Sequence, residues 1–479
     1  MNAVFKKMEE SDLAFFNEVR NECREMLHDT TKFSLNDTVS WFRKNKPSYF
    51  TIFLKNERIG YFRTSIVNSN RFVGMDLHKS QRGKGLAKEL YLEFFKTVKE
   101  KEIYLLVKSK NKIAHQLYKS LGFIEIIDSF LNIDKNSILM KKNMNKKVLL
   151  TGGCGFVGHH VIDHILRNTD WDIYCFDKMS YSSFGLKRLN EINALNNPRL
   201  KFFAFDLCSE IPEGMTEEIK DTNYILHIAA ESHVDNSISE PKPFIENNIN
   251  STVSLLEFSR IHCKNLEKFI FFSTDEVFGN AKEGFSYKEG DRHNCGNPYS
   301  ASKSACESIC ESYANTYNLP ILITNTMNII GERQHVEKFV PKVVKSILNK
   351  EKIYVHSYPD LIKTGTRFYI HARNVADAFI FILQNSKERL DCHDASVGRY
   401  NIVGVKEISN LDLVKTISKI MGEEADYELT DFHSDRPGHD LRYALNGDKL
   451  ASLGWKPPVN LEKSLEKTIN WTIKNKQWL

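Results

Sequence analysis

Five side chains in the second half of the sequence have types and spacings that suit proton transfer. Tyr299 and Lys303 are four residues apart, so in a helix a phenol and an ammonium would share one face. Thr274, Asp275 and Glu276 follow the apolar run 269–272 and bring a hydroxyl and two carboxylates to the end of a strand. Strand ends of this kind are where ligands bind in parallel sheets. We therefore take these five residues as the candidate catalytic set.

Tyr299 would act as a base only if its surroundings lowered its pKa. The ordinary value near 10 would have to fall by about 3 units, which requires about 4 kcal/mol. The Lys303 cation and the positive charge of a bound cofactor are plausible sources. A tyrosine and a lysine at this spacing also occur on solvated helices, and Ser-Thr-Asp alone is an ordinary turn or helix cap. The catalytic interpretation rests on the joint occurrence of both patterns with a glycine-rich turn earlier in the chain.

That turn is Thr151-Gly-Gly-Cys-Gly-Phe-Val-Gly158, which follows an apolar strand and leads into a helical pattern at 161–166. Backbone amides at a helix start bind a pyrophosphate, and glycines let the chain approach it closely. Asp177 ends the next strand, where a carboxylate can hold ribose hydroxyls, so the pattern favours NAD over NADP. The residues expected to hold NAD are Gly152, Gly155, Phe156, Val157, Gly158, Asp177, Lys178, Asp206, Leu207, Ala229, Ala230, Tyr299 and Lys303.

The elements that must position these residues form a regular alternation. Short apolar strands at 147–150, 173–176, 201–205, 224–228, 269–272 and 321–324 alternate with helical patterns. This rhythm predicts a doubly wound parallel sheet of the α/β class. Because 479 residues exceed one hydrophobic core, we expect a domain at 1–142, a linker at 143–147 and a second domain at 148–479.

The composition of the chain argues against several classes of protein. The net charge of +5 is small for a chain with 66 basic and 61 acidic residues, so no nucleic-acid partner is expected. The nine cysteines are scattered and fit no common zinc module, so neither a disulfide framework nor a metal site is expected. No run approaches the ~20 apolar residues of a membrane span, and the start lacks an apolar signal segment. We expect a cytoplasmic protein without membrane contact.

With these motifs in order, residues 146–479 resemble the extended short-chain dehydrogenase/reductases, and within them the dTDP-glucose 4,6-dehydratases. The resemblance is carried by the glycine turn, Ala229-Ala-Glu-Ser-His-Val-Asp235, Ser273-Thr-Asp-Glu-Val-Phe-Gly279, the Tyr299 to Lys303 helix start, and Asp435-Arg-Pro-Gly-His-Asp440. It implies a Rossmann-type sheet followed by a smaller C-terminal substrate-binding subdomain. The Asp275-Glu276 pair and the last motif distinguish dehydratases from the epimerases of the same superfamily.

The resemblance also implies a reaction, in which a nucleotide-glucose becomes a 4-keto-6-deoxy sugar. Tyr299 would take the 4-hydroxyl proton, Glu276 the proton at carbon 5, and Asp275 would protonate the departing 6-hydroxyl, while Thr274 holds the 4-oxygen. NAD would be regenerated in each turnover and stay tightly bound. A homodimer through a helix bundle is expected. By the same resemblance, the nucleotide-diphosphate sugar would be held by Ser232, Asn328, Lys338, Phe339, Arg367, Asn401, Arg436 and His439.

Three departures from the family pattern leave the substrate open. The usual paired asparagines read Asn328-Ile329, the Arg-Asp-Trp run reads Arg367-Phe-Tyr369, and Asn247 replaces a threonine. Both dTDP-glucose and UDP-glucose are therefore candidates. A nucleotide-sugar epimerase or decarboxylase is the alternative enzyme, and a silent NAD-binding module is the non-enzymatic alternative.

The first domain carries a second glycine motif. A strand at 72–78 leads into Gln81-Arg-Gly-Lys-Gly-Leu-Ala87 and an amphipathic helix through residue 98. This segment, with 111–118 and 121–123, resembles the mixed α/β domain of GNAT-type acetyltransferases, in which Tyr118 would protonate the departing thiolate. Asp76 and His78 are only candidates for a base. A simple Gly-Lys-Gly loop with a core tyrosine, in a non-catalytic assembly domain, is the alternative. The residues expected to hold acetyl-CoA are Arg82, Gly83, Gly85, Leu86, Ala87 and Asn111.

Together the two resemblances predict a bifunctional nucleotide-sugar enzyme. The 4-keto-6-deoxy sugar made by the second domain could be aminated by a separate enzyme and then N-acetylated by the first. Direct acyl transfer to such an amine is mostly catalysis by proximity.

Overall fold

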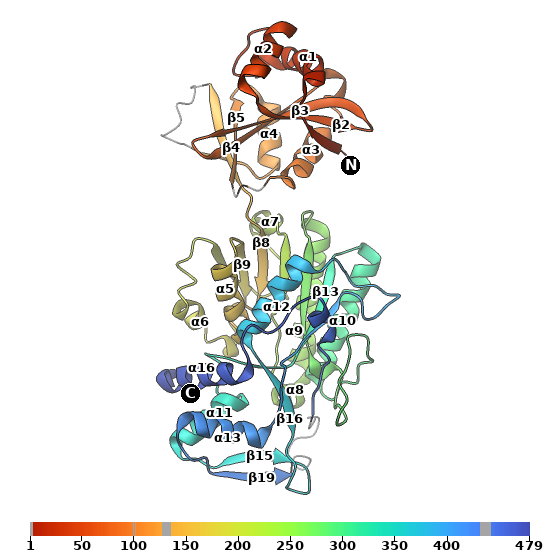
Figure 1. The fold of residues 1–479 in the computed structure, drawn as a ribbon. Helices are drawn as coiled ribbons and strands as arrows, with labels where there is room; N and C mark the ends of the chain where they lie inside the picture. Colours follow the sequence, from red (N-terminus) through yellow and green to blue (C-terminus); the bar gives the residue numbers. More distant parts are fainter. Residues whose placement is uncertain (1–2, 99, 101, 127–135, 432–441) are drawn as a thin grey trace. The chain divides into compact units, whose positions relative to one another are not determined.

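The structure is a computed structural model that describes residues 3–98, 100, 102–126, 136–431 and 442–479. The chain divides into two compact units, Met1–Asn145 and Lys146–Leu479, and each is described by itself (Figure 1). Strand β7 reaches Asn143 and strand β8 begins at Lys147, so the stretch outside both strands is shorter than the expected linker at 143–147.

The first unit is built on one sheet with the strand order β1-β2-β3-β4-β5-β7-β6. Neighbouring strands are antiparallel except for the parallel pair β4 and β5, which is paired only at Arg71–Ile103 and Phe72–Tyr104. Beyond those positions the two strands diverge. The strands are β1 Ala3–Lys7, β2 Ser48–Leu54, β3 Glu57–Val67, β4 Asn70–Leu77, β5 Glu102–Lys108, β6 Ile124–Glu125 and β7 Ser137–Asn143.

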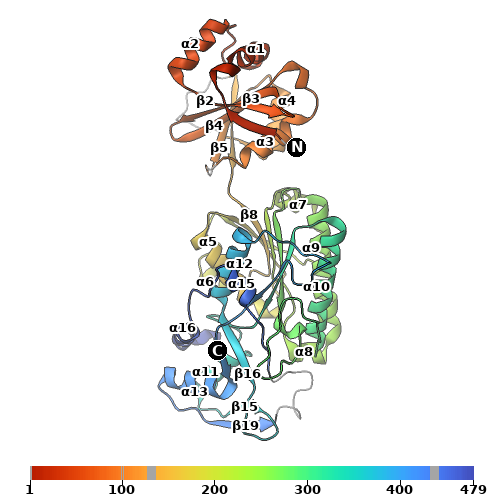
Figure 2. The ribbon, with the colours of Figure 1, turned by 45° about the vertical axis from the view of Figure 1, so that its right-hand side comes forward.

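Helices cover both faces of this sheet. Because side chains alternate along a strand, neighbouring Tyr61 and Phe62 enter different cores. Tyr61 packs with Leu13 and Phe16 of α1, whereas Phe62 packs with Phe94 of α3. In Figures 1 and 2, α1 and α2 lie on one side of the sheet, and α3 and α4 on the other. The helices are α1 Leu13–Cys23, α2 Leu35–Asn45, α3 Leu86–Phe95 and α4 Lys112–Ser120.

The second unit contains a seven-stranded sheet of order β10-β9-β8-β11-β12-β13-β17, and every pair in it is parallel. The six apolar runs of the sequence form its first six strands. The seventh, β17, contains Arg399 and Asn401, and its mixed composition gave no apolar run. The strands are β8 Lys147–Thr151, β9 Asp172–Asp177, β10 Leu200–Ala204, β11 Tyr224–His227, β12 Lys268–Thr274, β13 Ile321–Thr326 and β17 Arg399–Ile402.

Both faces of the sheet are covered, as a sheet of parallel strands requires. Leu149 packs against one helical layer and Leu150 against the other. Figure 2 shows α5 and α12 on one face and α9 and α10 on the opposite face. The helices of these layers are α5 Phe156–Asn168, α6 Lys187–Glu191, α7 Glu213–Ile219, α8 Val234–Ser239, α9 Pro241–His262, α10 Pro298–Tyr317, α12 Ala372–Asn385 and α15 Asp448–Ser452. The predicted doubly wound fold is confirmed.

A smaller subdomain with its own core follows, centred on Val344, Tyr369 and Leu413. Its helices are α11 Phe339–Asn349, α13 Asn410–Met421 and α16 Leu461–Lys474, and its strands are β14 Asn328–Ile330, β15 Ile353–Ser357, β16 Thr366–His371, β18 Glu407–Ser409 and β19 Tyr427–Asp431. Single turns of 3₁₀ helix are η1 Glu10–Asp12, η2 Arg24–Met26, η3 Lys79–Gln81, η4 Tyr181–Ser183, η5 Asp275–Val277 and η6 Lys476–Trp478. Among the described residues, no helix has the length and apolar character needed to cross a bilayer.

Candidate functional site

The glycine-rich turn after β8 is shaped by contacts that exclude side chains. Gly152 has φ +76°, and a Cβ there would lie 2.8 Å from the Ala229 backbone. A Cβ at Gly158 would lie only 2.0 Å from the Gly152 carbonyl oxygen. Gly155 is the N-cap of α5, so the first amides of that helix face the cavity that the turn lines. This cradle fits a pyrophosphate.

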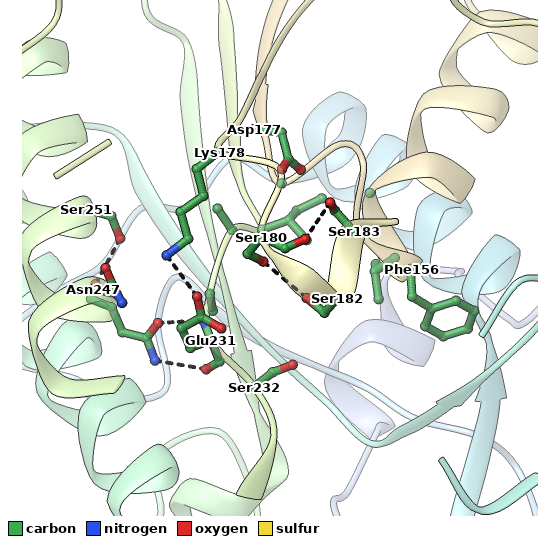
Figure 3. A pocket seen from close by; sticks show the side chains of 18 of the residues that line it. Phe156, Asp177, Lys178, Ser180, Ser182, Ser183, Glu231, Ser232, Asn247 and Ser251 are labelled. Carbon is green, nitrogen blue, oxygen red and sulfur yellow. Dashed lines mark hydrogen bonds and ion pairs between the residues drawn. The ribbon is translucent and has the colours of Figure 1, made fainter. Parts of the chain in front are cut away.

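Asp177 lies at the end of β9, as predicted, and is held by the turn itself. Its Oδ2 accepts a hydrogen bond from Cys154 N over 2.9 Å, and its Oδ1 accepts one from Met179 N over 2.7 Å. Burial raises the pKa of this carboxyl, and the two backbone donors oppose the rise. The next residue, Lys178, forms an ion pair of 2.8 Å with Glu231, and Figure 3 shows this pair reaching across the cavity.

This first cavity has a volume of about 240 Å³. All thirteen residues predicted to hold NAD line it. Sequence reasoning missed Arg188, Glu231 and Ser251, which also line it. Arg188 is fully buried on α6, where its Nη1 donates to the carbonyl oxygens of Cys154, Ser182 and Ser183 over 2.9–3.0 Å. An arginine in a short polar helix carries no local signal of burial.

The candidate catalytic residues are brought together by one strand end and one helix start. Thr274 closes β12 and caps η5, with its Oγ1 accepting from Glu276 N over 3.3 Å. Asn297 caps α10, and Pro298 occupies the first turn, a common helix-start pattern. Tyr299 and Lys303 follow on one face of this helix. Thr274 and Tyr299 are 25 residues apart in the chain. Both line a second cavity of this unit.

The two adjacent carboxyls have different surroundings. Asp275 is 5 % exposed; its Oδ1 accepts from Thr274 Oγ1 over 3.2 Å, and its Oδ2 has no hydrogen-bond partner among the described residues. Burial, and then the neighbouring Glu276, raise the pKa of Asp275 to about 7, while Arg367 opposes the rise. Glu276 is only partly buried, and its Oε2 accepts a hydrogen bond from Asn297 Nδ2 over 3.0 Å. Asp275 thus favours its protonated form, whereas the hydrogen bond from the Asn297 amide would stabilise a negative charge on Glu276.

Tyr299 differs from the simple expectation of a lowered pKa. Burial raises its pKa, and the charges of Glu276 and Asp275 add to the rise, whereas a hydrogen bond with Thr274 lowers it. Burial also lowers the pKa of Lys303, whose Nζ lies 4.1 Å from the centre of the Phe271 ring. The chain by itself therefore favours the neutral phenol, because burial and the two nearby carboxyls all disfavour the phenolate.

A second cavity of about 250 Å³ adjoins the first and shares Tyr299 with it. It is lined by the three candidate residues Thr274, Asp275 and Glu276, and by four residues predicted to bind the substrate: Ser232, Asn328, Lys338 and Phe339. Arg367 lies near enough to act on the charge of Asp275, with its guanidinium 4.6 Å from the centre of the Tyr443 ring.

Asn401 lies elsewhere. It is fully buried in β17, and its Nδ2 donates to the carbonyl oxygens of Tyr287 and Asn446 over 3.1 and 3.0 Å. It is not among the residues that line either cavity. The predicted substrate contacts Arg436 and His439 lie outside the described residues.

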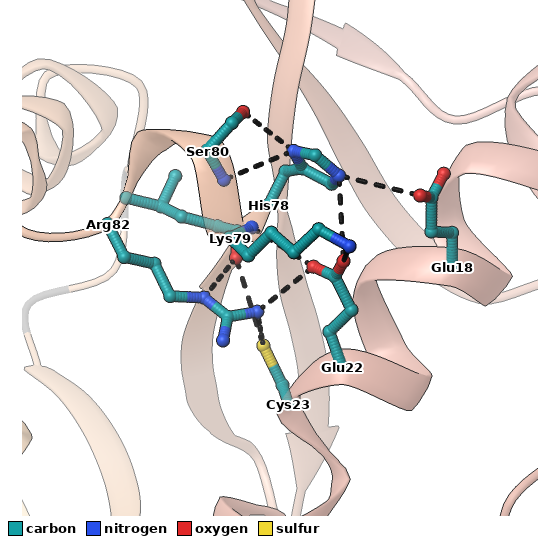
Figure 4. Close-up of polar contacts among 8 residues, drawn as sticks. Glu18, Glu22, Cys23, His78, Lys79, Ser80 and Arg82 are labelled. Atoms are coloured by element: carbon teal, nitrogen blue, oxygen red, sulfur yellow. Dashed lines mark hydrogen bonds and ion pairs between the residues drawn. The ribbon is translucent and has the colours of Figure 1, made fainter.

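In the first unit, the glycine loop lies between β4 and α3. Gly83 and Gly85 have φ values of +75° and +74°, and Gly85 is the N-cap of α3, which starts with Leu86 and Ala87. The side chain of Arg82 turns back onto the protein, where its Nε donates to Leu77 O over 2.8 Å and its Nη2 lies 3.3 Å from Glu22 (Figure 4). Arg82 therefore fixes the loop, whose backbone amides are the groups available to an anion.

Tyr118 and the two candidate bases lie in distinct settings. Tyr118 is buried on α4 and accepts a hydrogen bond from the Tyr91 hydroxyl over 3.3 Å, and burial raises its pKa. Asp76 forms a 3.0 Å ion pair with Arg63. The Nε2 atom of His78 lies 3.5 Å from Glu18 and 3.6 Å from Glu22. Figure 4 shows the imidazole directed toward these two side chains of α1.

Asn111 is the N-cap of α4, and its Oδ1 accepts from Ala114 N over 3.2 Å. Its side chain thus has a structural task in addition to the predicted contact with acetyl-CoA.

Each of the two units matches a known protein family. Residues 149–468 match the family model described as GDP-mannose 4,6 dehydratase, and residues 12–123 match that of the acetyltransferase (GNAT) family. The dTDP-glucose 4,6-dehydratase of Escherichia coli is 33 % identical over 358 residues, which cover 69 % of this chain and 95 % of the relative. A trifunctional UDP-glucose 4,6-dehydratase/UDP-4-keto-6-deoxy-D-glucose 3,5-epimerase/UDP-4-keto-L-rhamnose-reductase of Arabidopsis thaliana is 34 % identical over 70 % of this chain and 48 % of its own length.

Among solved structures, the dTDP-glucose 4,6-dehydratase of Streptomyces venezuelae, crystallised with NAD bound, superposes with a TM-score of 0.60. It is 29 % identical, and the match covers 69 % of this chain and 98 % of that one. The resemblance that the motifs indicated is confirmed. The chain belongs to the family of nucleotide-sugar 4,6-dehydratases and carries a GNAT domain before its dehydratase domain.

Proposed function

We propose that the second unit catalyses the 4,6-dehydration of a nucleotide-linked glucose, with NAD bound in the first cavity and the sugar in the second. The observation that carries this proposal is the contrast between Asp275 and Glu276. Asp275, with a pKa of about 7, keeps a proton near neutral pH, whereas Glu276 has a hydrogen-bond donor for its carboxylate. Loss of water needs one acid and one base side by side. Epimerisation at carbon 4 needs a group that exchanges the 4-hydroxyl proton but no such pair of carboxyls.

Each residue of the candidate catalytic set then has its own role in the reaction. Tyr299 takes the proton of the 4-hydroxyl, and Thr274 holds the 4-oxygen. When bound, NAD supplies an acceptor for the hydride of carbon 4, which returns at carbon 6, and a positive charge that opposes the raised pKa of Tyr299. Glu276 removes the proton at carbon 5, and Asp275 protonates the 6-oxygen, which leaves as water. Glu276 then returns the proton to carbon 5 as the hydride reaches carbon 6, and the proton held by Tyr299 passes through solvent to replace the one that Asp275 gave up. Tyr299 lines both cavities, so its phenol would contact the sugar in one and the nicotinamide in the other.

The nucleotide diphosphate is proposed to lie toward Lys338, whose cation suits its charge. Both dTDP-glucose and UDP-glucose are candidate substrates. The test is mass spectrometry of the products after incubation with each. Loss of one water supports dehydration, whereas an unchanged mass with altered stereochemistry would replace this proposal with epimerisation.

For the first unit we propose transfer of acetyl from acetyl-CoA to an amino sugar derived from the 4-keto product. Where β4 and β5 diverge, their edges offer backbone groups to an extended amide chain such as the pantetheine arm. Tyr118, with its raised pKa, retains the proton that a departing thiolate needs. His78 suits the base better than Asp76, because the Asp76 carboxylate is already engaged in an ion pair with Arg63.

The acetyl-transfer proposal is tested with acetyl-CoA and a nucleotide-linked 4-amino-6-deoxy sugar. Release of coenzyme A that depends on the sugar supports it, and no release above the rate without the sugar contradicts it. A 4-hydroxyl analogue of the same sugar is the matched control.

We also propose that the chain forms a homodimer through α9 and α10, which pack side by side and expose Ile245, Ile261 and Tyr317. Sedimentation equilibrium of the full chain should give twice the 55.4 kDa of one chain. A charged substitution at Ile261 should then shift the mass toward the monomer, and an unchanged mass would argue against this surface.

A further inference from the structure

The side chain of Asn297 joins the two halves of the proposed catalytic set. Its Oδ1 accepts a hydrogen bond from Ser300 N over 2.8 Å and so caps α10, the helix that carries Tyr299. Its Nδ2 donates to Glu276 Oε2 over 3.0 Å. Asn297 is 7 % exposed and is not among the residues that line the second cavity, so it would not touch the sugar.

The cap decides which end of the amide faces Glu276. An asparagine amide has one acceptor end and one donor end. Because the oxygen is used by Ser300 N, the NH₂ group must point at the carboxylate. A second hydrogen bond, from Asn297 N to Ser300 Oγ over 3.3 Å, completes a reciprocal capping box and holds this orientation. The donor is thus fixed before any substrate arrives.

From this geometry we infer that Asn297 is a positioning residue, which holds Glu276 in its ionised form and aims it at carbon 5 of the sugar. The inference rests on the proposed dehydration. A hydrogen bond to a carboxylate stabilises the charged form. Asp275 differs, because burial raises its pKa to about 7. Its Oδ1 accepts a hydrogen bond from the Thr274 hydroxyl over 3.2 Å, and its Oδ2 has no donor among the described residues. Deep burial of Asp275 and the amide donor at Glu276 together separate the acid from the base in two adjacent residues.

Other charges also act around Glu276. Asp275 precedes it, Tyr299 and Lys303 approach on α10, Arg367 lies on β16 near Asp275, and Lys338 lines the same cavity at the start of α11. Of these groups, Arg367 acts on Asp275, and Tyr299 is affected more strongly by the charge of Glu276 than by that of Asp275. Asn297 is distinguished by a direct donor to Glu276, so replacing it should affect proton removal at carbon 5 selectively.

The substitution Asn297→Asp tests this directly. The aspartate has the same size and keeps an oxygen for the cap, but it replaces the donor with a second negative charge beside Glu276. We expect kcat for dehydration at pH 7 to fall about tenfold or more, and the acidic limb of its pH profile to move up by about one unit, as expected for two neighbouring carboxyls. KM for the nucleotide sugar should change less than about twofold, because Asn297 makes no substrate contact.

A second measurement separates positioning from general damage. With a sugar deuterated at carbon 5, the kinetic isotope effect on kcat should increase in Asn297→Asp, because proton removal becomes slower than the redox steps. The matched control is Asn460→Asp. Asn460 caps α16 in the same unit by accepting from Lys463 N over 3.0 Å and has no part in the site. This control should keep the wild-type profile and isotope effect.

The outcomes are distinguishable. If the wild-type protein releases no water from either nucleotide-glucose, the proposed function fails. If the wild-type protein dehydrates the sugar but Asn297→Asp keeps its pH profile and isotope effect, the role of Asn297 is wrong. Should Asn297→Asp fold poorly, the pair Asn297→Ala and Asn460→Ala gives the same comparison, since each loses one helix cap but only the first loses the donor to Glu276.

Discussion

The carboxylate of Glu307 accepts a hydrogen bond from Asn325 Nδ2 over 2.9 Å, and both residues are fully buried. The same amide donates to the Thr274 carbonyl oxygen over 3.1 Å. Glu307 lies one helical turn after Lys303 on α10, and its charge raises the pKa of Lys303 against the effect of burial. A buried polar network therefore ties the strand end that carries Thr274 to the helix that carries Tyr299.

Replacing Glu307 with Gln should loosen this network and destabilise the second unit. Glu307 pairs with Arg399, and both side chains are almost fully buried. Removing one partner of a buried ion pair costs about 3 kcal/mol or more. Glu311→Gln is the control, because Glu311 also pairs with Arg399 but is partly exposed, and should cost about 1 kcal/mol at most. Urea unfolding followed by tryptophan fluorescence measures both, since Trp41 is the one tryptophan of five in the first unit.

Asp275→Asn should abolish dehydration but stabilise the fold at alkaline pH. The raised pKa of Asp275, about 7 against an ordinary value of 3.8, means that the native protein binds its proton more tightly than the unfolded chain. The stability gained from the neutral carboxyl is complete below pH 4 and is lost as the pH rises through 7. The variant should therefore match the wild type at pH 4 and exceed it by up to about 4 kcal/mol at pH 8. Equal stabilities at pH 8 would contradict the raised pKa.

The same pKa gives a pH dependence for the wild-type enzyme. If Asp275 is the acid, kcat for dehydration should decline as the pH rises above about 7. A rate that is flat from pH 6 to 9 would remove Asp275 from this role.

Gly158→Ala should abolish the binding of NAD. The added Cβ would lie 2.0 Å from Gly152 O, so the turn must open and its amides can no longer converge. Gly214→Ala is the matched control, because a Cβ at this position in α7 meets no atom of the described residues within 4 Å. The NAD content of each purified protein, measured after denaturation, should fall to a trace in the first variant and stay unchanged in the second.

Tyr118→Phe should slow acetyl transfer without weakening the binding of acetyl-CoA. The phenol is buried, and its raised pKa keeps it protonated across the neutral range, so its loss removes an acid worth about 100-fold in rate. Tyr91→Phe removes the hydroxyl that donates to it and should have a smaller effect. Coenzyme A release gives the rates and calorimetry the affinity. Equal rates in Tyr118→Phe and the wild type would assign Tyr118 to the core alone.

Much of the second unit is readable from the sequence because its signals are local. The apolar runs that precede Gly152 and Thr274 each form a strand of the parallel sheet, since a strand buried on both faces must be apolar along its length. The glycine turn, the Thr274 to Glu276 run and the Tyr299 to Lys303 spacing are also set by neighbouring residues. Their order along the chain predicted the family.

The sequence by itself determined which groups enter the site, and the tertiary structure decided what each group can do there. Asp275 and Glu276 are adjacent in the chain, yet their surroundings differ. Burial raises the pKa of Asp275, whereas the side-chain amide of Asn297, 21 residues later, donates a hydrogen bond to Glu276. Likewise, Arg188 and the pair of Glu307 and Asn325 gain their roles only from contacts between distant segments. Such contacts leave no periodic pattern, because burial and hydrogen-bond partners depend on how elements pack and not on the residues beside them in the chain.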